Sequence, residues 1–161
     1  MENSFHKVRR QDRLLDETRS IQLLETSEYG FLSLGINDMG YAYGIPISYA
    51  YDKENNVLYF HCAPEGQKLE ILQQNNKVSF CVIGETKPIS EKFTTLYESV
   101  IAFGIVDINL SDDDKRTAIR QLVKKYSPEH VELGETYMEK SFHRTHTFKM
   151  AIEHITGKCK K

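Results

Sequence analysis

Polar and apolar residues alternate along the chain in short runs, which is typical of β-strands. The most regular run is 41–51, where large side chains alternate with small ones. Successive strand side chains point to opposite faces, so we expect a large face in a core and a small face beside a flat ligand or another close-packed element. The large face comprises Tyr41, Tyr43, Ile45, Ile47, Tyr49 and Tyr51, and the small face Ala42, Gly44, Pro46, Ser48 and Ala50. Five further strands are predicted at 31–36, 57–62, 78–84, 97–108 (bending at Gly104) and 146–155.

Helical spacing appears between these strands. Helices are predicted at 16–28 and 67–74, and a third begins after Ser111, a good N-cap, and ends before Pro128. Residues 129–144 are ambiguous, with another short helix as one interpretation. Together these elements predict a single, mainly β domain over 1–161, an antiparallel β-barrel with inserted helices. Its ends are expected to be an N-terminal arm, 1–13, and a basic C-terminal tail, 156–161.

Composition narrows the function classes. The chain has 161 residues, of which 40% are hydrophobic and 27% charged, as in ordinary globular domains. A balance of 21 Lys and Arg against 23 Asp and Glu disfavours a nucleic-acid partner. The apolar runs fall far short of a membrane span, and no apolar segment follows the basic start, so we expect no membrane partner and no secretion signal. Cys62, Cys81 and Cys159 lack CxxC spacing and are expected to be free thiols in a cytoplasmic protein.

The strongest candidate for chemistry is the segment 61–68, HCAPEGQK. A strand end delivers His61, a turn with Gly66 follows, and Lys68 falls in the first turn of a helix. Helix N-termini attract anions, and a lysine there is unfavourable for the helix itself, which points to a bound anion such as phosphate. On the pattern alone, an ordinary surface lysine and a half-buried strand histidine are the simpler interpretations.

Other constellations are weaker. His143, His146, His154 and Cys159 could suggest zinc, but no CxxC or HExxH frames them, and we expect no metal site. A serine hydrolase would be expected to show G-x-S-x-G, and a nicotinamide-binding domain G-x-G-x-x-G; neither motif is present.

The order of several segments resembles the FMN-binding split-barrel superfamily that includes pyridoxamine 5′-phosphate oxidase. Within it, the chain is most similar to the Nim branch, the 5-nitroimidazole resistance proteins. The segments that carry the resemblance are RRQDR (9–13), YGFLSL (29–34), YGIPISYAYD (43–52), VLYFHCAPEGQKLEIL (57–72), NKVSFCV (76–82), YESVIAFGIVDI (97–108) and IEHITGKCKK (152–161).

The resemblance implies a homodimer of split barrels that holds two FMN molecules at the subunit interface. It places Pro46, Ile47, Ser48 and Tyr49 along the isoalloxazine ring and His61 and Cys62 beside the flavin. It makes Gly66, Gln67 and Lys68 the phosphate turn, with Lys68 as its cation, and puts Tyr97, Glu98 and Ser99 near the cofactor. His61 is the expected catalytic residue, which steers the acceptor and donates a proton.

The implied function is an FMN-dependent oxidoreductase of the nitroreductase type. It would pass electrons from an unidentified donor to a nitroimidazole or another small acceptor. Two departures matter: Cys62 stands where many relatives carry Ser, and Lys158, Lys160 and Lys161 do not reproduce the substrate-phosphate arginines of the oxidase proper. Vitamin B6 oxidation is therefore disfavoured. The alternative is a non-catalytic flavin- or haem-binding or redox-sensing protein.

Overall fold

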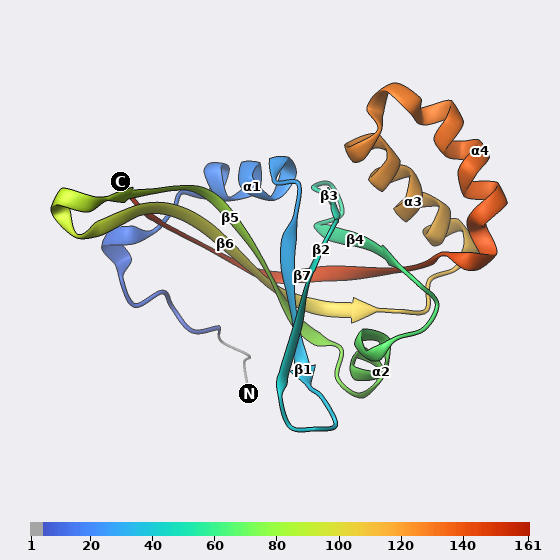
Figure 1. The fold of residues 1–161 in the computed structure, drawn as a ribbon, viewed down its shortest axis with the longest axis horizontal. Coiled ribbons are helices and arrows are strands. Elements are labelled where there is room, and N and C mark those ends of the chain that lie inside the picture. The colour runs from blue at the N-terminus through green and yellow to red at the C-terminus, as the bar shows by residue number, and fades with distance from the viewer. Residues whose placement is uncertain (1–4) are drawn as a thin grey trace.

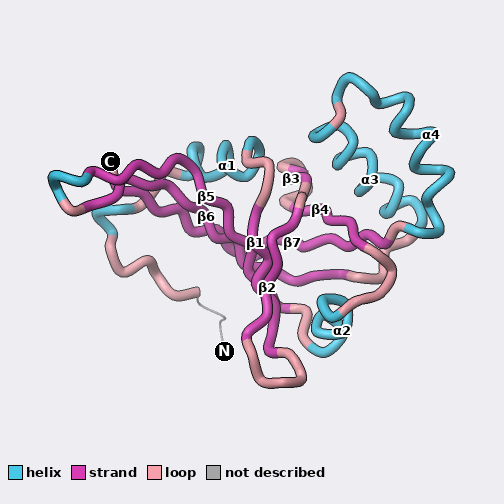
Figure 2. The backbone as a smooth tube through the Cα atoms, viewed as in Figure 1, coloured by secondary structure: helices cyan, strands magenta, loops and turns pink. Residues whose placement is uncertain are grey.

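The computed structural model describes residues 5–161 and is built on one antiparallel sheet of seven strands (Figures 1 and 2). The strands lie in the order β2-β1-β5-β6-β7-β4-β3. Their bounds are β1 Gly30–Ile36, β2 Ala42–Ile47, β3 Ala50–Asp52, β4 Val57–Cys62, β5 Lys77–Ile89, β6 Thr94–Asp107 and β7 His146–Lys160. The predicted class, mainly β and antiparallel with inserted helices, is confirmed.

The sheet closes on itself at the link between β2 and β3. These strands lie at opposite ends of the strand order, yet only Ser48 and Tyr49 separate them in the chain. A link this short spans at most about 10 Å, so the two edges must approach each other there. The edges are not hydrogen-bonded to each other, which leaves a barrel that is split along this seam.

The barrel core is aromatic. Phe60 stacks on Phe148 with ring centroids 4.9 Å apart and meets Phe80 edge-on at 5.4 Å. The ring of Tyr49 meets Phe80 edge-on at 4.6 Å, and its hydroxyl donates to the Leu24 carbonyl at 2.7 Å. All four rings are fully buried, so Tyr49 of the seam shares one core with strands β4, β5 and β7.

In the described part of the chain, four α-helices pack around the barrel: α1 Glu17–Thr26, α2 Gln67–Gln74, α3 Asp112–Tyr126 and α4 Val131–Ser141. As predicted, Ser111 caps α3, accepting a hydrogen bond from the Asp114 N–H at 3.1 Å. Helix α3 lies over β3, β4 and the start of β7, and α4 folds back on it as a hairpin; α2 packs near β1 (Figure 1). The α3–α4 hairpin and helix α2 therefore form two different surfaces near the end of β4.

Several boundaries differ from the sequence prediction. The run 41–51 is two strands, because the chain crosses the seam at Ser48 and Tyr49. Tyr41 lies outside the core in the turn before β2, where its N–H donates to Asn37 Oδ1. The connector around Pro88 is strand, paired with Thr95 in a long hairpin. The ambiguous segment contains α4, and at Gly104, where a bend was expected, the pairing of β6 with β7 shifts in register.

The chain ends pair with each other. The expected tail 156–161 is instead largely the end of β7, paired with β6. The described part of the arm runs along this strand: the Leu15 N–H donates to the Gly157 carbonyl at 3.1 Å, and Phe5 stacks on His154 at 4.6 Å. Residues 1–4 of the expected arm lie outside the described residues.

Candidate functional site

At the end of β4, neighbouring side chains face opposite sides of the sheet: the barrel core on one side and helix α3 on the other. Leu58 and Phe60 point into the core, so His61 points to the opposite face, which α3 covers. Cys62 points inward again and packs against the edge of the core. The two adjacent residues that the sequence places beside a flavin therefore face opposite sides of the sheet.

His61 lies in an open groove of about 540 Å³ between the barrel and the α3–α4 hairpin. Ser48, from the seam, lines the same groove, so the structure brings two of the predicted site residues together. The remaining lining comes mainly from the two helices: Ile119, Leu122, Val123, Tyr126, Ser127, His130, Leu133, Gly134, Tyr137, Met138, Ser141 and Thr145. The helix α3 was predicted from the sequence, whereas α4 lies in the segment 129–144 that the sequence left ambiguous.

Partial burial lowers the pKa of His61 below its ordinary value. At neutral pH its imidazole is therefore mostly neutral, with one N–H to donate and one nitrogen to accept. Its partner across the strands is Thr147, which is 2% exposed and whose hydroxyl has no hydrogen-bond partner within residues 5–161. Opposed strand side chains lie close enough to interact, so Thr147 offers an unused polar group beside His61.

The turn before α2 collects hydrogen-bond donors. Gly66 has φ +135°, a conformation that favours glycine, and no side chain caps the helix that begins at Gln67. The Lys68 ammonium lies over this turn, 3.8 Å from where a Cβ on Gly66 would be. In the described chain Lys68 has no ion-pair partner.

Lys68 also acts on two groups at the inner side of the strand end. Burial raises the pKa of the Cys62 thiol, and the positive charge of Lys68 partly opposes that shift. Burial lowers the pKa of His146, which is paired across the strands with Cys62; the charges of Lys115 and Lys68 add to this lowering, and a hydrogen bond with the Ile108 backbone opposes it. The Nε2 atom of His146 is buried without a hydrogen-bond partner in the described part of the chain.

A cavity of about 230 Å³ lies at this corner, bordered by Gly66 and His146 and also by the acids Glu65 and Glu70. The start of α2 borders this cavity, the Lys68 ammonium lies close by over Gly66, and the Nε2 atom of His146 faces the same corner. The N–H groups of the helix start and the Lys68 ammonium can bind an anion with a compact charge, such as a phosphate monoester. His146 is a member of this corner that the sequence analysis did not assign.

The seam residues divide between surface and core. Pro46 is exposed and Ser48 lines the groove, whereas Ile47 and Tyr49 are buried. The Tyr49 backbone is already bonded: its N–H donates to the Tyr126 hydroxyl at 2.9 Å, and its carbonyl lies 3.0 Å from the same oxygen. A ligand along this strand would therefore meet the side chains of Pro46 and Ser48 but not that of Tyr49.

Tyr97, Glu98 and Ser99 lie far from His61 in the same chain. Glu98 pairs with Cys159 and His61 with Thr147 on β7, twelve residues apart (159 − 147), which is roughly 40 Å at about 3.3 Å per residue. Glu98 is also held by Arg19 of α1, whose Nη2 lies 2.7 Å from Oε2. One copy of the chain does not bring this stretch to the groove or to the Lys68 turn.

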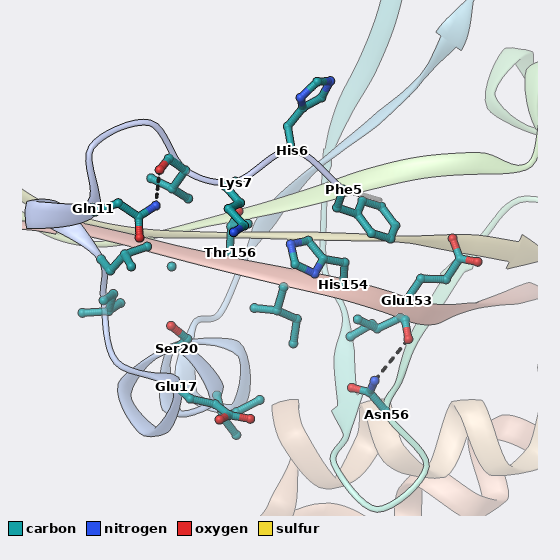
Figure 3. Close-up of a pocket in the computed structure, with 17 residues that line it drawn as sticks. Phe5, His6, Lys7, Gln11, Glu17, Ser20, Asn56, Glu153, His154 and Thr156 are labelled. Carbon is teal, nitrogen blue, oxygen red and sulfur yellow. Dashed lines mark hydrogen bonds between the residues drawn. The ribbon is translucent and has the colours of Figure 1, made fainter. Parts of the chain in front are cut away.

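A separate cavity of about 630 Å³ lies between the N-terminal arm, α1 and β7 (Figure 3). Phe5 and His154 stack on one of its walls, while His6 points away from the strand. None of the site residues predicted from the sequence lines it.

Within residues 5–161 there is neither a cluster of metal-ligating side chains nor a helix that could span a membrane. His143, His146, His154 and Cys159 do not come together, and no three His, Cys, Asp or Glu side chains in that range are grouped to hold a metal ion. None of the helices in that range has the length and apolar character to cross a membrane.

The antiparallel split barrel defines a fold class that comparison with known families specifies further. A sequence model of the pyridoxamine 5′-phosphate oxidase family matches residues 16–159. The chain belongs to this family. No curated protein matches the chain.

Solved structures share the fold. One is a candidate 5-nitroimidazole antibiotic resistance protein from Bacteroides thetaiotaomicron VPI-5482, with TM-score 0.70 and 23% identity over 91% of this chain and 86% of that one. A second is an FAD-binding protein from Mesorhizobium loti, with TM-score 0.62 and 21% identity over 92% and 98%. A third is an FAD and heme binding protein from Mycobacterium smegmatis, with TM-score 0.73 and 19% identity over 91% and 72%. At these identities the likeness establishes the fold alone.

Proposed function

We propose that the protein is an FMN-binding oxidoreductase, with the FMN phosphate bound at the turn before α2. The observation that carries this proposal is the Lys68 ammonium, which has no ion-pair partner within residues 5–161 and lies over the turn at the uncapped N-terminus of α2. A phosphate dianion satisfies these donors, and the family membership supports a flavin as the molecule that carries it.

The flavin ring would lie along the small face of the seam strand, against Pro46 and Ser48. When bound, FMN supplies the electron-transfer chemistry. Lys68 and the α2 N-terminus would fix its phosphate, and the groove would shield the reacting partner from water. The free thiols of Cys62, Cys81 and Cys159 are consistent with the reducing cytoplasm.

A second copy of the chain would complete this site. If Tyr97, Glu98 and Ser99 contact the same flavin as Lys68, they would come from a partner, because Glu98 lies roughly 40 Å along β7 from His61, which is at the strand end that leads into the Lys68 turn. The outer face of the sheet offers a surface for that partner: Phe31 and Ile101 flank Cys81 on neighbouring strands and are 46% and 36% exposed. A homodimer that buries this apolar row is part of the proposal.

His61 would act on the acceptor. Reduction of a nitro group consumes protons as well as electrons, and His61 can hold a proton at the wall of the groove. Because burial lowers its pKa, the protonated fraction falls as neutrality is approached, and His61-dependent turnover should increase below pH 7. Nitroimidazole-type acceptors are our first candidates, supported by the shared fold with the Bacteroides protein.

A second candidate is a non-catalytic flavin- or haem-binding module. It is favoured by two imidazoles, His61 and His130, on one apolar groove and by the shared fold with the FAD and heme binding protein. Protein that binds FMN or haem but turns over no donor and acceptor would support this candidate.

The phosphate assignment is tested with Lys68→Met, using the exposed Lys77→Met as the matched control. Hydrogen bonds to charged groups contribute about 1.5–3 kcal/mol, so Lys68→Met should raise the Kd for FMN about 10- to 150-fold. Riboflavin, which lacks the phosphate, should bind wild type and variant alike in the same flavin-fluorescence titration. Equal losses for both flavins would show that Lys68 does not bind the phosphate.

A further inference from the structure

The groove between the barrel and the α3–α4 hairpin has an unusual lining for this chain. None of its fourteen described lining residues is Asp, Glu, Lys or Arg, although 27% of the chain is charged. Its volume of about 540 Å³ falls in the range of small-molecule sites. An ion placed in such a groove loses hydration without gaining a charged partner, whereas an uncharged molecule does not bear this cost.

Contacts between α3 and α4 fix the hairpin that forms one wall of the groove. On the side away from the groove, Arg120 pairs with Glu135 and Arg116 with Glu139, at 2.7 and 3.2 Å. At the helix crossing Gly134 lies so close to α3 that a Cβ there would be 2.5 Å from Val123 Cγ1. These contacts fix the separation of the two helices, so a ligand would meet a largely pre-formed wall.

The groove is lined by aromatic side chains and by polar side chains that make no hydrogen bond within residues 5–161. Tyr137 and Leu133 are 68% and 67% exposed at its mouth, a large apolar surface for a soluble helix. Within residues 5–161, the side chains of Ser48, His61 and His130 make no hydrogen bond to the protein. The lining therefore combines aromatic contact area with hydrogen-bonding groups that a ligand can use.

We propose that this groove binds an uncharged aromatic molecule, with its ring against Tyr137 and the apolar face of α3 and a polar substituent at His61 and Ser48. The inference rests on the proposed function in one respect: the molecule that binds is the electron acceptor. Binding of this molecule to the groove can be measured without any catalytic turnover.

The experiment is a calorimetric titration of the purified, FMN-saturated protein at neutral pH with two probes of one ring system, 2-naphthol (neutral) and 2-naphthoate (an anion). Wild type should bind 2-naphthol at least about tenfold more tightly than 2-naphthoate, because the carboxylate would be desolvated without a partner. Tyr137→Glu, which puts a charge on the groove wall at an exposed position, should weaken 2-naphthol binding by about tenfold or more. Tyr41→Glu, at an equally exposed tyrosine away from the groove, should leave it unchanged.

Every other result contradicts either the groove as a binding site or the proposed function, and the results that contradict each of them differ. Equal affinity for the two probes, or Tyr137→Glu binding like wild type, overturns the assignment. Loss of FMN from Tyr137→Glu would make the groove the flavin site, and a change in its sedimentation would make it a protein interface; both overturn the assignment as well. If wild type binds no FMN and flavin-free protein still gives the expected probe pattern, the groove stands as a binding site and the proposed function fails.

Discussion

The Tyr126 hydroxyl holds the seam of the barrel to the end of α3. It accepts a hydrogen bond from the Tyr49 N–H at 2.9 Å and lies 2.5 Å from the Glu28 carbonyl and 3.0 Å from the Tyr49 carbonyl. One hydroxyl therefore satisfies the backbone where β2 passes to β3 and where α1 passes to β1. Tyr126→Phe removes that oxygen and keeps the ring.

The expected cost follows from the groups left behind. The Tyr49 N–H belongs to a fully buried residue and loses its acceptor, and an unsatisfied buried donor costs about 1–3 kcal/mol. For a chain of this size, each kcal/mol lowers Tm by about 2–4 °C, so Tyr126→Phe should melt about 2–12 °C below wild type. Thermal unfolding followed by circular dichroism, at fixed flavin saturation, measures the difference.

Tyr137→Phe is the matched control, because it makes the same change in the same groove at an exposed tyrosine whose hydroxyl has no hydrogen bond among the described residues. It should stay within about 0.5 kcal/mol of wild type. If Tyr126→Phe melts together with Tyr137→Phe, the hydroxyl does not hold the seam.

Three further predictions concern groups near the site. Burial of Lys125 lowers its pKa to about 8 from 10.5. Between these pH values the unfolded chain binds more protons than the folded one, so the free energy of unfolding measured by urea titration should rise with pH. A Lys125→Met variant that shows the same rise would contradict this. Thr147→Val removes a buried hydroxyl without a partner and should stabilise the protein by about 1 kcal/mol in chemical denaturation; a loss of stability would mean that the hydroxyl is bonded. His61→Ala should retain FMN and lose about 10²–10⁴-fold in nitroaromatic turnover, with His61→Gln between; wild-type turnover in His61→Ala would leave His61 without a catalytic role.

Much of the barrel could be predicted because its local signals agree. The run 57–62 alternates, the turn before it is polar, and the helix after it has regular apolar spacing, so β4 and α2 appear where expected. The helices predicted from 16 and after Ser111 likewise begin there, since Asp16 and Ser111 both accept a hydrogen bond from the first turn.

The features that the sequence did not predict depend on contacts between residues far apart in the chain. The alternation of large and small side chains continues through Ser48 and Tyr49, so no local signal shows that the chain passes there from β2 at one sheet edge to β3 at the other. At this point the Tyr49 N–H bonds to the hydroxyl of Tyr126, 77 residues away, instead of to a neighbouring strand. Helix α4 has one apolar side that faces the groove and lacks a capped start, which hid it in the ambiguous segment 129–144. His146 joins the anion corner only through pairing of β7 with β4.

The measurement that tests the central claim most directly is an absorbance titration of the purified, flavin-free protein with FMN. The account predicts a yellow complex that saturates at one FMN per chain and sediments as a dimer, with much weaker FMN binding in Lys68→Met. A protein that remains colourless after FMN addition and gel filtration would contradict the account.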